Sequence, residues 1–163
     1  MIGAIVGDIA GSSYEHSIFN LKTKSQSLFP RDSHFTDDTI MTCAIAEAMV
    51  EFTASSKTAD LHELVVRHMR DWGHRYPDAG YGARFNSWLK ADNPQPYNSY
   101  GNGSAMRVSP VAWFSKTVEE AENYAKISAE VTHNHSEGIK GAQAVAGAVF
   151  LALQNKSKNE IAD

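Results

Sequence analysis

Apolar residues recur at helical spacing along most of this chain. Four segments carry such a stripe: residues 40–52, 60–72, 117–132 and 137–153. Because residues three and four apart share one face of a helix, each segment predicts an amphipathic helix with one buried side. Two of them begin with the spacing of a capping box, at Asp60–Glu63 and Thr117–Glu120. The fourth is the most apolar and is expected to be largely buried.

Shorter helical segments are predicted at residues 2–10, 82–89 and 105–114. In the first of these, glycine stands at every fourth position, at Gly3, Gly7 and Gly11, and such a stripe lets another backbone approach closely. A nucleotide-binding P-loop is excluded here, because the segment has neither the GxGxxG spacing nor a lysine and hydroxyl after a glycine.

The composition narrows the class of protein. A chain of 163 residues with 42% hydrophobic residues is expected to form a single domain. A net charge of −4 and scattered cationic residues do not favour nucleic-acid binding. No leader sequence and no apolar run of about 18 residues is found, so we expect a soluble, cytoplasmic protein without a membrane span. A single cysteine, Cys43, excludes an internal disulfide and is expected to be buried.

Four oxygen-bearing side chains stand together at the entrance to the 40–52 helix: Thr36, Asp37, Asp38 and Thr39. Two interpretations are open. Thr36 or Asp37 could cap the helix, with Asp38 complementing the helix dipole. Alternatively, because adjacent carboxylates repel each other, an oxygen-coordinated cation could bind them.

Two further regions carry candidate polar groups. Glu15 follows a turn-forming stretch and is either a solvated residue or part of a site. The loop at residues 92–104 is rich in Asn, Pro, Gly and Ser; its successive amides could surround a phosphate, or it could be a plain connector. His133 and His135 are two residues apart and do not share a helix face, so a hydrogen-bonding role at a helix junction is favoured over a zinc site.

Taken together, the motifs resemble the ADP-ribosylglycohydrolase family. The resemblance covers nearly the whole chain and rests on Gly7–Gly11 with Tyr14 and Glu15, Phe35–Thr39, Ser99–Gly103 with Ala105–Arg107, and Thr132–His133. It implies an all-α, compact orthogonal helical bundle. It also implies a hydrolase, a glycosidase that cleaves the bond between ADP-ribose and an acceptor at a binuclear metal-binding site. Two magnesium ions (Mg²⁺) are expected in the complete family site, with manganese (Mn²⁺) as the other option.

The same resemblance assigns roles to individual residues. Thr36, Asp37, Asp38 and Glu15 match the metal ligands, and Glu15, Asp37 and Asp38 match the catalytic set. Glu15 is implicated in positioning or activating the water. The substrate-binding set, which would hold ADP-ribose or an ADP-ribosylated substrate, comprises Ser99, Tyr100, Gly101, Asn102 and His133.

One family feature has no match in this chain. Members usually supply a second acidic metal motif from a C-terminal helix, of the form Asp, any residue, Asp, Ser or Thr. We therefore expect residues 1–163 to form a single ADP-ribosylglycohydrolase-like domain that is C-terminally truncated. Its apolar surfaces would then be exposed, which predicts self-association, low stability or pairing with the missing segment. A non-catalytic ADP-ribose-binding module, or an inactive fragment, is the alternative function.

Overall fold

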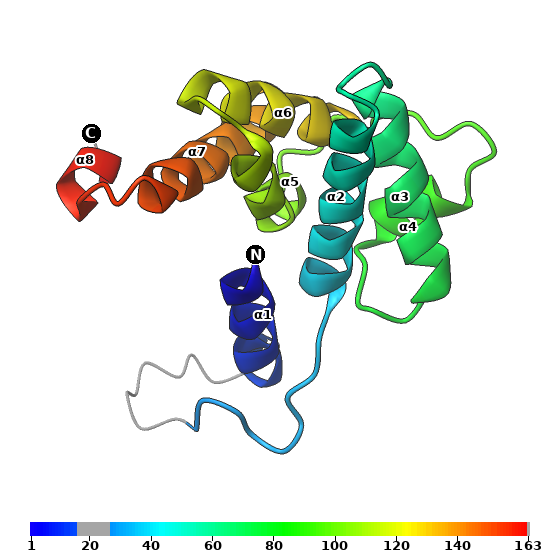
Figure 1. Cartoon of the computed structure of the whole chain (residues 1–163). Helices are drawn as coiled ribbons and strands as arrows, with labels where there is room; N and C mark the ends of the chain where they lie inside the picture. The colour runs from blue at the N-terminus through cyan, green and yellow to red at the C-terminus, as the bar shows by residue number, and fades with distance from the viewer. Residues whose placement is uncertain (16–26, 163) are drawn as a thin grey trace.

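The computed structural model describes residues 1–15 and 27–162. Within these ranges the chain is helical and contains no β-strand, which confirms the all-α prediction. Nor is any helix in them long and apolar enough to cross a bilayer. Figure 1 shows the elements in chain order: α1 (Ile2–Glu15), α2 (Asp37–Ala54), α3 (Leu61–Arg75), α4 (Ala83–Lys90), α5 (Gly103–Met106), the 3₁₀ helix η1 (Ser109–Phe114), α6 (Val118–Glu130), α7 (Ser136–Leu153) and α8 (Lys158–Ala162).

The polar residues predicted to begin helices do so. The Asp60 carboxylate accepts the backbone N–H of His62 at 2.8 Å at the start of α3. The Thr117 hydroxyl accepts the backbone N–H of Glu120 at 3.1 Å at the start of α6. Each of these bonds satisfies a backbone donor that has no partner within its own helix. The caps therefore set where these two helices begin.

The helix predicted at residues 105–114 is instead two short elements, α5 and η1. Pro110 lies in the first turn of η1, where its missing N–H costs nothing. The proline ring also disfavours the α conformation at the preceding residue, so one continuous helix does not form through this point. Both short elements, α5 and η1, pack against α2 and α7.

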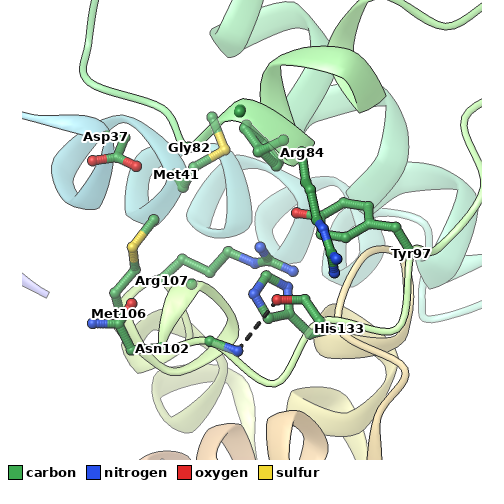
Figure 2. Close-up of a pocket in the computed structure, with 14 residues that line it drawn as sticks. Asp37, Met41, Gly82, Arg84, Tyr97, Asn102, Met106, Arg107 and His133 are labelled. Carbon is green, nitrogen blue, oxygen red and sulfur yellow. Dashed lines mark hydrogen bonds between the residues drawn. The ribbon is translucent and has the colours of Figure 1, made fainter.

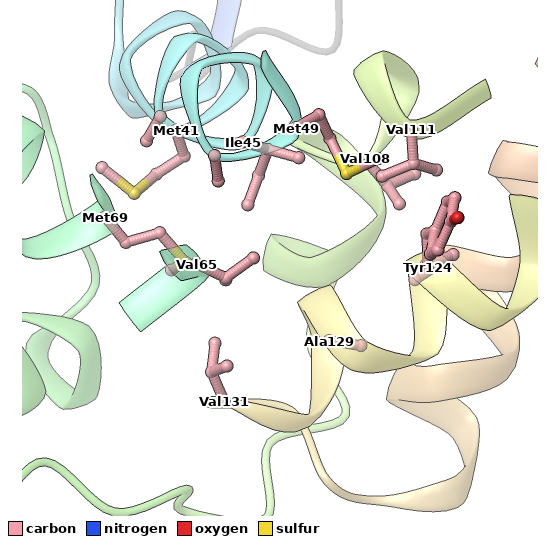
Figure 3. Packing of buried hydrophobic residues seen from close by; sticks show 14 of the residues in the cluster. Met41, Ile45, Met49, Val65, Met69, Val108, Val111, Tyr124, Ala129 and Val131 are labelled. Carbon is pink, nitrogen blue, oxygen red and sulfur yellow. The ribbon is translucent and has the colours of Figure 1, made fainter. Parts of the chain in front are cut away.

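The hydrophobic core is organised around α2, which packs against α3 and η1, while α6 packs along α7. Figure 3 shows the centre of this core, to which several helices and the link between α5 and η1 contribute fully buried side chains: Met41, Ile45, Met49, Val65, Met69, Val108 and Val111. Ala44 and Ala48 of α2 are also fully buried, and their small side chains allow neighbouring helices to approach closely. This packing makes α2 a rigid base for whatever stands at its N-terminal end.

Two predictions of burial are wrong in part. Cys43 is half-buried, because it lies on the side of α2 that carries Glu47 rather than on the core side. Along α7, Ala142 and Ala146 are fully buried, whereas Val145 is 37% exposed. Only one face of α7 packs against the rest of the chain that the structure describes, so the helix is less buried than its apolar composition predicts.

Helix α1 lies at one end of the molecule and packs against α2 (Figure 1). None of its residues is buried, and Ile2 is 77% exposed. A methyl group added at Gly3, Gly7 or Gly11 would meet nothing within 4 Å in the described structure. The glycine stripe therefore has no neighbour among residues 1–15 and 27–162. The predicted exposure of apolar surface is confirmed here, and self-association stays a prediction.

Candidate functional site

The N-terminal end of α2 is tied to α1 through a single carboxylate, that of Asp8. It accepts the backbone N–H groups of Thr36 at 2.8 Å and of Thr39 at 3.1 Å. It also accepts the hydroxyl protons of both threonines, with 2.6 Å between the Thr36 oxygen and Asp8. The sequence analysis did not include Asp8 among the candidate site residues. The feature that could have drawn attention to it is that Asp8 is the lone acid in the apolar, glycine-rich segment at residues 2–10.

Thr36 is the N-cap of α2, so the capping interpretation is confirmed for this residue. Its hydroxyl oxygen accepts the backbone N–H of Asp38 at 3.3 Å while its proton goes to Asp8. A hydroxyl oxygen has two lone pairs. Because the proton is already donated to a carboxylate, the second lone pair is free to face a cation. The cap and the metal-ligand interpretations are therefore compatible.

The acidic groups around this helix start are too close for all of them to be charged comfortably. The pKa of Asp37 is raised to about 6, first by burial and then by the charges of Asp38, Glu15 and Asp8. The pKa of Asp38 is raised by burial and by the charges of Asp8 and Glu15. Helix capping alone gives no reason to gather four carboxylates, whereas a cation would offset their repulsion.

A cavity of about 130 Å³, here called the acidic cavity, opens beside these residues. Its lining residues come from the end of α1, the approach to α2 and the loop after α3: Ser12, Glu15, residues 34–37 and residues 78–80. Three of the predicted metal ligands, Glu15, Thr36 and Asp37, thus line one space. Asp38 is adjacent in sequence and does not line this cavity.

A second cavity, of about 340 Å³ and here called the main pocket, also has Asp37 in its lining. Its walls come from α2, α4, the loop before α5, and the junction between α6 and α7: Asp37, Met41, residues 82–85, Tyr97, Ser99, residues 101–103, Met106, Arg107 and His133. In Figure 2, Asp37 lies at one end of the pocket and His133 at the other, with the Arg107 guanidinium between them. Asp37 is shared by both cavities.

The loop before α5 brings three of the predicted substrate-binding residues, Ser99, Gly101 and Asn102, to the main pocket. It is held against the α6–α7 junction, where the backbone N–H of Asn98 donates to the Asn134 side chain at 2.8 Å. Tyr100 lies elsewhere: it is 74% exposed, and its ring centroid is 5.4 Å from that of His135. The structure thus brings Ser99, Gly101, Asn102 and His133 together and leaves Tyr100 at the surface.

Arg107 was not predicted as a site residue, yet it lines the main pocket and is only 1% exposed. Its guanidinium donates to the Ser128 carbonyl at 2.7 Å and to the Thr132 hydroxyl at 2.9 Å. Burial lowers the pKa of Arg107 to about 10, so it stays charged at neutral pH. Burial and the Arg107 charge together lower the pKa of His133 to about 4, so this imidazole is neutral.

The dependence of α1 on Asp8 gives a first prediction. Asp8→Ala removes four hydrogen bonds to the start of α2, and the rest of α1 is held by half-buried residues and by the Ser12 hydroxyl, which accepts the His34 N–H within the described structure. Hydrogen bonds to a charged group contribute roughly 1.5 to 3 kcal/mol, so amide hydrogen exchange in α1 should accelerate by at least about tenfold while α3 and α6 are unaffected. The matched control is Asp71→Ala on the exposed side of α3. Unchanged protection of α1 in the Asp8 variant would show that other contacts hold this helix.

The family model described as ADP-ribosylglycohydrolase matches residues 1–163. Human ADP-ribosylhydrolase ARH3 is 32% identical over 188 residues, covering 98% of this chain and 50% of that protein. ADP-ribosylarginine hydrolase Tri1 of Pseudomonas putida is 26% identical over 188 residues, covering 98% of this chain and 47% of that protein. The chain spans about half the length of the curated relatives it matches.

Proposed function

Because this chain belongs to the ADP-ribosylglycohydrolase family, we propose that it acts in the hydrolysis of the glycosidic bond between ADP-ribose and an acceptor, in an ADP-ribosylated protein or a small-molecule conjugate. One observation carries the proposal. Asp37 lines both the acidic cavity and the main pocket, so one carboxylate borders a cluster of acids and a space of about 340 Å³. Pockets of roughly 300 to 1,000 Å³ are typical for small ligands.

The main pocket would take the ADP-ribose. Arg84 and Arg107 both line it, and their positive charges would offset the negative charges of a diphosphate. Ser99, Gly101 and Asn102 offer backbone N–H and side-chain polar groups on one loop, which suits phosphate and ribose oxygens. His133, which lies against Gly101 of the same loop and against Gly103 at the start of α5, would contact the ligand within the pocket. Tyr100 would contact it from the exposed side of the loop.

Divalent cations would bind at the start of α2, in and beside the acidic cavity. We propose two Mg²⁺ or Mn²⁺ ions held by Glu15, Thr36 and Asp37, which line the cavity, and by the adjacent Asp38. All the donors are oxygens, as such hard cations prefer. No three His, Cys, Asp or Glu side chains within the described ranges are set to hold one ion. That is compatible with Mg²⁺, which keeps several waters and is often bound by one or two carboxylates plus substrate oxygens. Bound there, the ions would polarise water and orient the ribose.

The carboxylates would also act directly on the reaction. Cleavage at an anomeric carbon passes through an oxocarbenium-like transition state, which nearby negative charge stabilises. Asp37, with its pKa raised to about 6, borders the space where that positive charge would develop. Glu15 lies at the last position of α1 and lines the acidic cavity, where it would orient the attacking water and accept its proton.

A second candidate function is ADP-ribose binding without catalysis. It is favoured by the observation that no three His, Cys, Asp or Glu side chains in the described part of the chain are grouped around one ion position. The chain could bind ADP-ribose in the main pocket without hydrolysing its conjugates. That function needs the loop at residues 99–102, His133 and the arginines, and it does not need the acidic cavity. The two functions therefore differ in how they depend on Asp37 and Asp38.

Measuring binding and turnover together separates these functions. For the hydrolase we expect ADP-ribose release from ADP-ribosylated peptides that requires Mg²⁺ or Mn²⁺ and is lost with a chelator. Changing Asp37 and Asp38 to Ala should abolish that release. Calorimetry measures ADP-ribose binding to the same variants. If ADP-ribose still binds after both substitutions, and the unaltered protein hydrolyses no ADP-ribose conjugate, the binding module is favoured. Hydrolysis unaffected by chelation would contradict the proposed role of the cation.

A further inference from the structure

Behind His133 lies a chain of buried polar groups whose hydrogen bonds to one another play no part in the proposed function. It runs from the Arg107 guanidinium to the Thr132 hydroxyl, 2.9 Å apart, and from that hydroxyl to His133 Nδ1, 2.8 Å apart. The three side chains are 1%, 0% and 5% exposed, respectively. The two hydrogen bonds between these side chains are shielded from solvent, so the proton in each bond can be assigned from the donors and acceptors present.

The direction of the hydrogen bonds follows from Arg107. A guanidinium only donates, so the Thr132 oxygen must accept from it. The Thr132 hydroxyl still has one proton to donate. Among the described residues, His133 Nδ1 is the nitrogen or oxygen acceptor that lies within hydrogen-bond distance of this hydroxyl, and a buried donor is rarely left without an acceptor. Nδ1 therefore carries a lone pair rather than a proton.

Tyr97 is the neighbour that could compete for the Thr132 proton. Burial raises the pKa of Tyr97, and hydrogen bonding with Thr132 opposes part of that rise. The phenol oxygen could accept this proton, but the hydrogen bond that the described structure shows for the Thr132 hydroxyl toward an acceptor is the one to His133 Nδ1, at 2.8 Å. The geometry therefore favours His133 Nδ1 over the Tyr97 oxygen as the acceptor of the Thr132 proton.

We infer that Arg107 and Thr132 are positioning residues that fix His133 as the neutral tautomer with its proton on Nε2, so that His133 donates a hydrogen bond into the main pocket. This rests on the proposed function only in its choice of ligand. The group that His133 recognises is then an acceptor oxygen, such as a phosphate or ribose oxygen, and not a donor.

The surroundings of the ring agree with this orientation. A methyl group added at Gly103 would lie 3.0 Å from both Cε1 and Nε2 of His133, and one at Gly101 would lie 3.9 Å from Nε2. The Nε2 edge therefore faces the loop that lines the pocket, while the Nδ1 edge faces Thr132. In Figure 2, Arg107 and Tyr97 both extend toward the His133 ring from different elements.

Nitrogen-15 NMR of the histidine-labelled protein tests this inference directly. Long-range couplings distinguish the two neutral tautomers, and a His133→Gln spectrum assigns the resonances. We expect the Nε2–H form in the unaltered protein across pH 6 to 8. An Nδ1–H form, or an even mixture of the two, would overturn the inference without any variant having to fold.

Two variants identify the residue responsible. Thr132→Val removes the hydroxyl proton that fixes the tautomer, so a measurable minor population of the Nδ1–H form should appear beside the Nε2–H form, and Thr132→Ser should restore the single Nε2–H form. Tyr97→Phe is the matched control and should leave the tautomer unchanged. A single Nε2–H form that persists in Thr132→Val, or a tautomer that changes in Tyr97→Phe, would overturn the role of Arg107 and Thr132.

Binding then connects the tautomer to the ligand. Thr132→Val should weaken ADP-ribose binding by up to about tenfold in calorimetry, the factor expected for one lost hydrogen bond to a charged or polar oxygen, with Thr132→Ser close to the unaltered protein. If the unaltered protein binds no ADP-ribose, the proposed function fails while the NMR result still decides the tautomer. If ADP-ribose binds and both Thr132 variants bind it equally well, His133 does not act as the donor proposed here.

Discussion

Asp37→Asn is expected to raise the melting temperature of the metal-free protein and to abolish its stabilisation by Mg²⁺ or Mn²⁺. The pKa of Asp37 is about 6 in the folded chain, against an ordinary value of 3.8. The folded state therefore binds the Asp37 proton more tightly than the unfolded state between about pH 4 and 6. In that interval stability falls as the pH rises, and the full penalty is present at pH 7.

The size of this effect follows from the shift, reduced for the partial exposure of the carboxylate. A penalty of about 1 to 2 kcal/mol corresponds to roughly 2 to 8 °C in melting temperature for a domain of this size. An amide carries no charge, so Asp37→Asn should remove the penalty at pH 7 and change little at pH 4. Asp92→Asn, an exposed acid in the loop after α4, is the control and should shift neither curve.

The same substitution should have a large effect on hydrolysis. Asp37 borders both cavities, so Asp37→Asn should lower the rate of ADP-ribose release by at least about a hundredfold, as when a group that stabilises transition-state charge is removed. Thermal shift is read with Mg²⁺, with Mn²⁺ and with a chelator. If the cation stabilises Asp37→Asn as much as it stabilises the unaltered protein, Asp37 is excluded as a ligand.

Gly138→Ala is expected to damage both the fold and the ligand pocket. A methyl group at Gly138 would lie 2.7 Å from the Ser99 carbonyl oxygen and 3.1 Å from His133 Cβ. The nearest atom belongs to the backbone of the loop, which cannot rotate away as a flexible side chain would. We expect a loss of about 1 to 3 kcal/mol of stability and at least a tenfold loss of ADP-ribose affinity, because Ser99 and His133 both line the main pocket.

Gly141→Ala is the matched control, one helical turn further along α7. A methyl group there would meet nothing within 4 Å in the described structure. Alanine is favoured over glycine inside a helix by about 0.5 to 1 kcal/mol, so this variant should be as stable as the unaltered protein or more stable. Thermal unfolding and calorimetry measure both variants. Equal behaviour of the two would mean that the Ser99 loop yields without cost and that close packing at Gly138 does not shape the pocket.

Several features of this protein were predictable from short stretches of sequence. The starts of α3 and α6 follow from Asp60 and Thr117, whose side chains bond to backbone N–H groups two or three residues away. The acidic start of α2 and the polar loop at residues 92–104 were recognisable as candidate sites in the same way. Cys43 shows the limit of this approach, because its position near the core stripe did not reveal that it is half-buried.

The residues that sequence reasoning missed are those whose partners are distant in the chain. Asp8 bonds to Thr36 and Thr39, 28 and 31 residues away. Arg107 bonds to Thr132, 25 residues away. A lone acid in an apolar helix and an arginine before a proline turn carry no local pattern that names such partners. Their roles exist only once α1 meets α2 and the α6–α7 junction closes over the loop before α5.

The sequence alone determined the helical class, the helix starts and the residue types available for the site, because periodicity, capping and backbone preference act within one or two turns of chain. Only the tertiary structure decided that Asp37 borders two cavities, that Arg107 is buried beside His133, and that Tyr100 lies at the surface. Burial and charge interactions arise between segments far apart in sequence. They depend on how the helices pack, and a pKa shift or a shared pocket cannot be read before that packing is known.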